Sequence, residues 1–286
     1  MSRKLALCLG LGLLLLPTAV LAQTQSYRFT AREASNGQID LTLQRNSNSR
    51  NTRGWNREAL QGLAATPFAA GAPVRFRIVR EAGTLSCEGS GSGSRGEGEC
   101  RFERAASYFD GLRQRGVSVS RDWDAMQLAW FEVPLALLDE LKRQGYETPE
   151  VEELIGAGVF KIDVAWLREI DAAGYRLQEL KDLIPFRIFK IDAGFIRDLK
   201  AANPKLRLGA KDLVQMRIHK VEPSWVAGWT QLGYDLSPDQ LVNTRIHNVS
   251  PDYARAMMAE VRDRPTLDQF VRMRIHGVRP NGKAGR

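Results

Sequence analysis

A sequence repeat of about 29 residues is the feature that most constrains what this chain can fold into. Alignment of the chain with itself gives unit starts separated by 29, 29, 29, 30, 28 and 29 residues: Cys100, Ala129, Gly158, Arg187, Arg217, Arg245 and Arg274. In the complete units the ninth position and the position four residues later are apolar, which is the spacing of one helical face. A second apolar pair, such as Leu241-Val242, closes each unit. Two short helices cannot bury their apolar faces alone, so the repeat predicts an αα-repeat array, similar to an α-solenoid, over residues 102–286.

The residues before this repeat have the pattern of strands rather than helices. Apolar and polar residues alternate over residues 38–43 and 74–79, as expected of strands that bury one face. Residues 45–58 are rich in Asn, Ser and Arg and predict a loop. We therefore expect a small antiparallel β domain over residues 23–101, which makes the fold class α+β.

Two cysteines of the expected β domain, Cys87 and Cys100, flank a turn rich in Gly and Ser. The midpoint between them falls at Gly93-Ser94, so a hairpin would place the two side chains opposite each other. The sequence therefore predicts a disulfide. The alternative is a reactive or metal-binding pair, but no His or third Cys is near in the sequence, and we expect neither a metal nor a cofactor.

The first 22 residues have the features of an export signal. Arg3 and Lys4 precede a leucine-rich run over residues 5–16, and Val20-Leu21-Ala22 supplies the small residues that a signal peptidase accepts. We expect cleavage after Ala22 and a periplasmic or secreted protein. The alternative is an uncleaved anchor, for which the run is short. Later residues contain no run of the roughly 18 apolar residues that a membrane span needs, so no transmembrane segment is expected in the mature chain.

The net charge of +8 is spread thinly along the chain. Residues 23–99 contain 10 basic against 7 acidic side chains, and residues 100–286 contain 29 against 26. A nucleic-acid-binding protein usually concentrates its basic residues in a patch or stripe, so we expect no nucleic-acid partner. A solvated surface is the simplest interpretation, and contact with an anionic envelope polymer is the alternative.

A seven-residue motif, RIHxVxP, contains every histidine of the chain: His219, His247 and His276. They occupy the third position of their units, where the earlier units have phenylalanine: Phe102, Phe131, Phe160 and Phe189. A position that accepts both residues is expected to be a half-buried part of the scaffold. Neighbouring helices pack about 8–10 Å apart, too far for equivalent side chains to share a zinc ion with bonds of about 2 Å. The alternatives are a pH-responsive seam and adventitious metal binding.

Arginine stands at the first position of the last four units: Arg187, Arg217, Arg245 and Arg274. Pairing with acids on adjacent helices, such as Asp212 or Asp239, is the expected role. The alternative is a row of cations that forms, together with His219, His247 and His276, a binding face for an anionic peptide or polymer.

Motifs of catalysis are absent from the sequence, which contains no HExxH, no GxSxG and no P-loop. The repeat already accounts for all three histidines. We therefore expect that the protein is not an enzyme, with an unrecognised hydrolase as the weaker alternative.

The segments RIHKVEPSWVAGWTQLGYDLSPDQLVNT and RIHNVSPDYARAMMAEV resemble the helical repeats appended to bacterial membrane metallopeptidases of the beta-lactam-sensor, antirepressor type. The hairpin ending GEGECRFER is similar to the β segment that precedes those repeats. The resemblance covers roughly residues 74–280, and it implies a free-standing exported version of the sensor's accessory region. The chain lacks the HExxH and the transmembrane helices of that family, so no peptidase role transfers to any residue.

These features predict a non-catalytic exported repeat protein that binds a protein or peptide partner through the face of arginines and histidines. Solenoids commonly present extended binding surfaces. The alternative is a protein that binds envelope polysaccharide, in which exposed Trp225 and Trp229 would stack on sugars.

Overall fold

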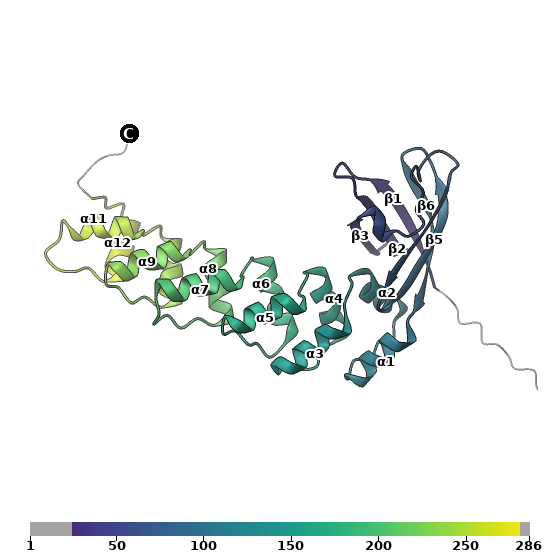
Figure 1. The fold of residues 1–286 in the computed structure, drawn as a ribbon. Coiled ribbons are helices and arrows are strands. Elements are labelled where there is room, and N and C mark those ends of the chain that lie inside the picture. The colour runs from purple at the N-terminus through teal and green to yellow at the C-terminus, as the bar shows by residue number, and fades with distance from the viewer. Residues whose placement is uncertain (1–24, 281–286) are drawn as a thin grey trace, which may run out of the picture.

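The computed structural model describes residues 25–280, and the expected leader peptide over residues 1–22 lies outside the described residues. A six-stranded antiparallel sheet is followed by an elongated array of paired helices (Figure 1). The predicted α+β fold with a helical repeat array is confirmed. Within the described range, none of the helices has the length and apolar character needed to cross a membrane.

The sheet has the spatial order β3-β2-β1-β6-β5-β4, and every neighbouring pair is antiparallel. The strands and the single turn of 3₁₀ helix that follows β3 are β1 (Ser26–Glu33), β2 (Ile39–Asn46), β3 (Ser49–Trp55), η1 (Arg57–Ala59), β4 (Pro73–Arg80), β5 (Gly83–Gly91) and β6 (Arg95–Arg104). Alternate side chains such as Phe29, Leu41 and Phe76 are buried, so one face of the sheet forms the core.

The loop expected over residues 45–58 is wrong, because β3 lies inside it and pairs with β2. The polar sequence is compatible with a strand because β3 is an edge strand, and only its last residue, Trp55, is fully buried. An edge strand can expose most of its side chains and therefore shows little hydrophobic alternation.

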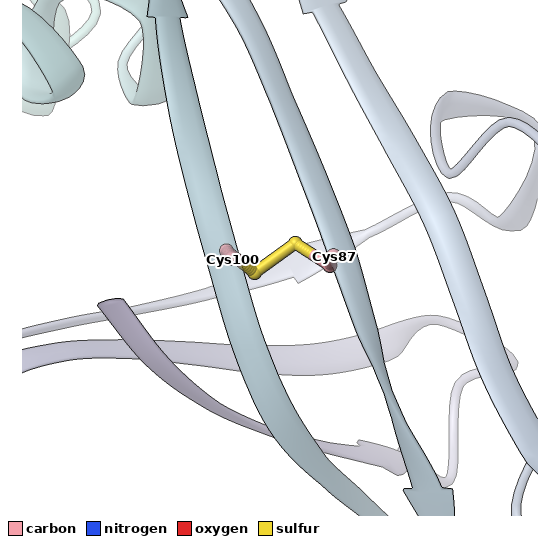
Figure 2. Close-up of a disulfide and its surroundings, with 2 residues drawn as sticks. All are labelled: Cys87 and Cys100. Carbon is pink, nitrogen blue, oxygen red and sulfur yellow. A yellow bond between two sulfur atoms is a disulfide. The ribbon is translucent and has the colours of Figure 1, made fainter. Parts of the chain in front are cut away.

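Cys87 and Cys100 form a disulfide between directly opposed positions of β5 and β6 (Figure 2). Both side chains are buried, and the turn between the strands covers residues 92–94. The predicted bridge is confirmed, and it fastens β5 to β6, the strand that leads into the array.

Each unit of the array contains a first helix and a second helix. The first helices are α1 (Ala106–Gln114), α3 (Leu135–Gln144), α5 (Val164–Ala172), α7 (Ala193–Ala202), α9 (Pro223–Gln231) and α11 (Pro251–Met258). The second helices are α2 (Asp122–Trp130), α4 (Val151–Val159), α6 (Ile184–Ile188, preceded by the 3₁₀ turn η2, Leu180–Leu183), α8 (Ala210–Ile218), α10 (Pro238–Ile246) and α12 (Leu267–Ile275). From α1 to α9 the first helices form one row, and from α2 to α8 the second helices form another (Figure 1).

Sheet and array share one continuous core. Trp55 at the end of β3 packs edge to face on Trp130 at the end of α2, with ring centroids 5.1 Å apart. Tyr27 of β1 lies against Trp123 of α2, and its hydroxyl donates to the carbonyl of Asp122. The sheet therefore covers α2, the second helix of the first unit.

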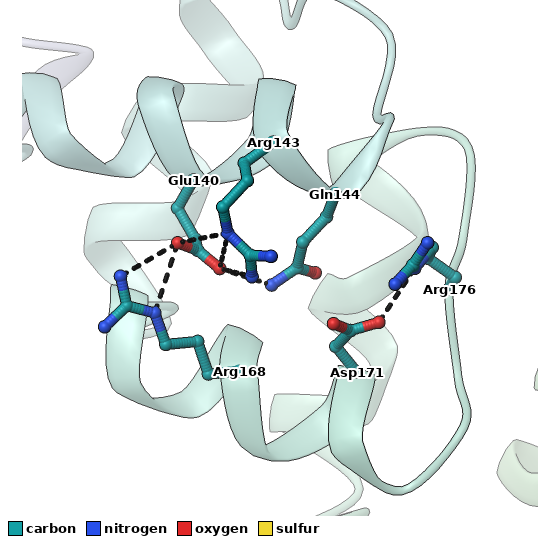
Figure 3. A network of polar contacts seen from close by, with 6 residues as sticks. All are labelled: Glu140, Arg143, Gln144, Arg168, Asp171 and Arg176. Atoms are coloured by element: carbon teal, nitrogen blue, oxygen red, sulfur yellow. Dashed lines mark hydrogen bonds and ion pairs between the residues drawn. The ribbon is translucent and has the colours of Figure 1, made fainter.

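A buried carboxylate connects the first helices of two consecutive units (Figure 3). Glu140 of α3 is 3% exposed and accepts hydrogen bonds from Arg143, from Gln144 and, across the unit boundary, from Arg168 of α5 at 3.0 Å. The hydrogen bonds from Arg143 contribute most to lowering the pKa of Glu140, to about 2, with Arg168 and Gln144 adding to the effect.

Replacing Glu140 with Gln should therefore lower the free energy of unfolding at neutral pH by about 1–2 kcal/mol. A lowered folded-state pKa stabilises the fold above the unfolded value of 4.5, and this contribution disappears as the pH falls towards about 2. Chemical denaturation between these pH values should show a steeper acid loss for the natural protein than for Glu140→Gln. Parallel curves would contradict this role for Glu140.

Candidate functional site

The three copies of RIHxVxP stand where α8, α10 and α12 end, and the first two copies also begin the next first helices, α9 and α11. Arg245, Ile246 and His247 form the last turn of α10, and Asn248 then adopts a left-handed backbone conformation with φ of 53°. Its amide donates to the carbonyl of Arg245 at 3.1 Å, and the amide of Val249 donates to Thr244 at 2.7 Å. This pair of bonds is the Schellman arrangement, which satisfies carbonyls left free at a helix end.

The same helix termination recurs through the array. Left-handed backbone follows every second helix, at Glu132, Lys161, Lys190, Lys220, Asn248 and Gly277. The next residue donates its amide back into the helix at 2.7–3.0 Å in every unit: Val133, Ile162, Ile191, Val221, Val249 and Val278. We call the edge formed by residues 130–134, 159–163, 188–192, 218–222, 246–250 and 275–279 the motif edge.

The remaining motif positions secure the next helix. Val249 is fully buried, and Ser250 caps α11 by accepting a hydrogen bond from the amide of Tyr253 at 3.0 Å. Pro251 then occupies the first turn of the helix, where its missing amide proton carries no penalty. Asp163 and Asp192 cap α5 and α7 in the same way.

The histidines occupy the last, capping position of their helices, as do the phenylalanines of the earlier units. His219 and His247 are half-buried and His276 is exposed, each in a different unit. In the part of the chain that the structure describes, no group of three or more His, Cys, Asp or Glu side chains is arranged to hold a metal ion. Phe102 differs from the other third-position residues because it lies in strand β6.

The predicted arginines each stand directly before a segment of the motif edge, but among the described residues they do not pair with Asp212 or Asp239. Each guanidinium instead lies over an aromatic ring of the preceding unit: Arg187 on Trp166, Arg217 on Phe195, Arg245 on Trp225 and Arg274 on Tyr253, at 5.1, 3.8, 3.8 and 5.1 Å from the ring centroid. Cation–π stacking of this kind contributes about 0.5–2 kcal/mol per pair.

Two of these arginines also reach back to the previous motif. Arg187 donates from Nε to the carbonyl of Phe160 at 2.8 Å, and Arg217 donates to that of Lys190 at 2.9 Å. These carbonyls stand at the negative end of a second helix, which favours a cation. Burial lowers the pKa of Arg245, with Glu222 acting in the opposite direction. The arginines therefore fasten one unit to the next, and their half-buried guanidinium groups leave only part of each cation for a partner.

The second position of the motif projects an apolar side chain into solvent. The exposed fractions are 44% for Val159, 50% for Ile188, 45% for Ile218, 57% for Ile246 and 61% for Ile275. We call these five residues the apolar row. Trp130, the equivalent residue of the first motif, is fully buried under Trp55. The sequence analysis did not identify these residues, although from the second unit on an apolar residue stands directly before the Phe or His.

The two tryptophans considered for sugar stacking do not present free ring faces. Trp229 is 1% exposed and packs against Tyr234 and Phe270. Trp225 lies beneath Arg245, and its Nε1 donates to Thr244 at 2.9 Å. Both rings belong to the packing between units.

Two hollows lie along the motif edge. A groove of about 900 Å³ runs along the end of β3 and the first two motifs and is lined by Arg53, Trp55, Phe131, Val159 and Lys161, among others. A hollow of about 420 Å³ in the following units is lined by Phe160, Trp166, Arg187 and Lys190 with their neighbours. The motif edge thus combines exposed apolar side chains, basic side chains and concave surface.

Comparisons of the chain with protein-family models, with curated proteins and with solved structures found no match.

Replacing Lys220, one of the residues with left-handed backbone, tests the helix termination. Lys220→Gly should raise the free energy of unfolding by about 0.5–1 kcal/mol because glycine adopts this conformation freely, whereas Lys220→Val should lower it by about 1–2 kcal/mol. Lys142→Gly, inside α3, is the control and should be destabilising. If Lys220→Gly and Lys142→Gly change stability in the same direction, the left-handed stop is not the constraint described here.

Proposed function

We propose that this chain is a non-catalytic, exported binding protein that holds a protein or peptide partner along its motif edge. The observation that carries the proposal is the apolar row, since Ile188, Ile218, Ile246 and Ile275 are each 45–61% exposed at the same position of successive units. Many other residues of the motif have a structural role, such as stacking, helix capping or burial. A row of exposed isoleucines has no such role and is typical of an interaction surface.

Export is supported by the leader-like first residues and by the disulfide between Cys87 and Cys100, a bond that persists mainly in oxidising compartments. The resemblance to accessory repeats of sensor peptidases also favours an extracytoplasmic interaction module. The proposed location is the periplasm or the extracellular medium.

The test is crosslinking in cells with tagged protein, comparing the natural chain with a variant in which Ile188, Ile218 and Ile246 are replaced by Ser. Because these side chains are exposed, the variant should keep its fold, which circular dichroism and thermal unfolding would check. Charge reversal of Arg217, Arg245 and Arg274 is less suitable, since it would remove the stacking between units.

We expect a specific partner to be captured by the natural protein and lost from the triple Ser variant. Val79→Ser, which alters an exposed apolar residue of the sheet, is the control and should keep the partner. Equal capture by all three proteins would contradict a role for the motif edge.

A further inference from the structure

The first motif already shows how the motif edge holds an extended chain, because the protein's own strand β3 is bound there. Trp55 packs on Trp130 with ring centroids 5.1 Å apart. Two residues earlier, Arg53 donates from Nη1 to the carbonyl of Trp130 at 2.7 Å and from Nη2 to Glu132 at 2.6 Å. The edge therefore receives an apolar side chain on the second motif position and a charged side chain on the left-handed position.

The spacing of these two contacts follows from strand geometry. Arg53 and Trp55 are two residues apart in β3, so their side chains leave the same face of the strand. An extended segment with a charged residue and, two positions later, a large apolar residue can repeat this contact pair on another unit.

In the following units, the second motif position and the left-handed position are exposed, whereas β3 contacts them in the first motif. Val159, Ile188 and Ile218 are exposed where Trp130 is covered. The groove of about 900 Å³ begins at the contact of β3 with the first motif and is lined by Val159 and Lys161 of the next one. The uncovered surface is thus continuous with an interface that the fold already uses.

The charge at the left-handed position reverses after the first motif. Glu132 is replaced by Lys161, Lys190 and Lys220 at the equivalent positions, and all three lysines are exposed. The acids of these motifs have partners of their own. Asp163 and Asp192 accept hydrogen bonds from helix amides, and Glu222 pairs with Arg217. Where the first motif accepts an arginine, the next three suit a carboxylate.

We propose that the units starting at residues 158, 187 and 217 bind an extended acidic segment of a protein partner, in which a Glu or Asp is followed two positions later by a large apolar residue. The carboxylate faces Lys161, Lys190 or Lys220, and the apolar side chain covers Val159, Ile188 or Ile218. This inference rests on the proposed function and specifies the chemistry of the partner.

The test measures fluorescence anisotropy of the purified protein with a fluorescein-labelled peptide of repeated Glu-Thr-Leu-Thr and with the same peptide carrying Lys in place of Glu. Two triple variants with the same net charge are compared. One is Lys161→Glu, Lys190→Glu and Lys220→Glu on the motif edge. The control is Lys142→Glu, Lys205→Glu and Lys211→Glu, whose exposed lysines lie in or beside the loops at the opposite ends of the helices.

We expect the natural protein and the control variant to bind the acidic peptide, and we expect the affinity of the edge variant to be lower by about tenfold or more. The edge variant should in turn prefer the Lys peptide. Replacing the peptide leucines with Ser should also weaken binding, because the apolar row would lose its contact.

Equal affinity of the natural protein for the two peptides, equal loss in the two triple variants, or no binding of either peptide would overturn the inference. Displacement of the acidic peptide by polygalacturonate, with no effect of the leucines, would overturn it in favour of an anionic polymer. Capture of a partner in cells that depends on the isoleucines but not on the three lysines would refute the acidic segment and leave the proposed function standing.

Discussion

The left-handed residue after each second helix is the constraint on which the rest of the array depends. It closes the helix with two backbone hydrogen bonds and turns the chain, and in the first five motifs the following Val or Ile is buried. Because the same turn recurs at Lys161, Lys190 and Lys220, successive units are placed in equivalent ways. Two positions of the motif then acquire fixed directions: the arginine lies back on the preceding unit, and the residue after it points outward.

Much of this architecture could be predicted from the sequence. The spacing of the unit starts indicated paired helices, and the position of Gly93-Ser94 between Cys87 and Cys100 indicated the hairpin and its disulfide. Strand β3 could not be recognised, because an edge strand with one buried residue lacks hydrophobic alternation. The partners of the arginines were also beyond reach, since Arg217 stacks on Phe195, and such a contact depends on how units pack rather than on spacing within one unit.

The apolar row escaped prediction for a different reason. An apolar residue in every unit normally indicates a buried position, and at Trp130 that expectation is correct. Burial there is provided by the sheet, whose Trp55 packs on Trp130. Exposure of Ile218 and Ile246 therefore follows from the length of the array relative to the sheet, which no local sequence pattern contains. The β domain acts both as the end cap of the array and as an example of what the motif edge can hold.

If the motif edge is uncovered, its isoleucine methyl groups are accessible to a soluble paramagnetic agent, and NMR measures this accessibility. Ile162 and Ile191 are internal controls, because they belong to the same motifs and are 3% and 1% exposed. We expect strong relaxation enhancement at Ile188, Ile218, Ile246 and Ile275 and weak enhancement at the two controls. Protection of the four edge isoleucines equal to that of Ile191 would show that another part of the chain, or a second copy, already covers the edge, and an open binding surface would be ruled out.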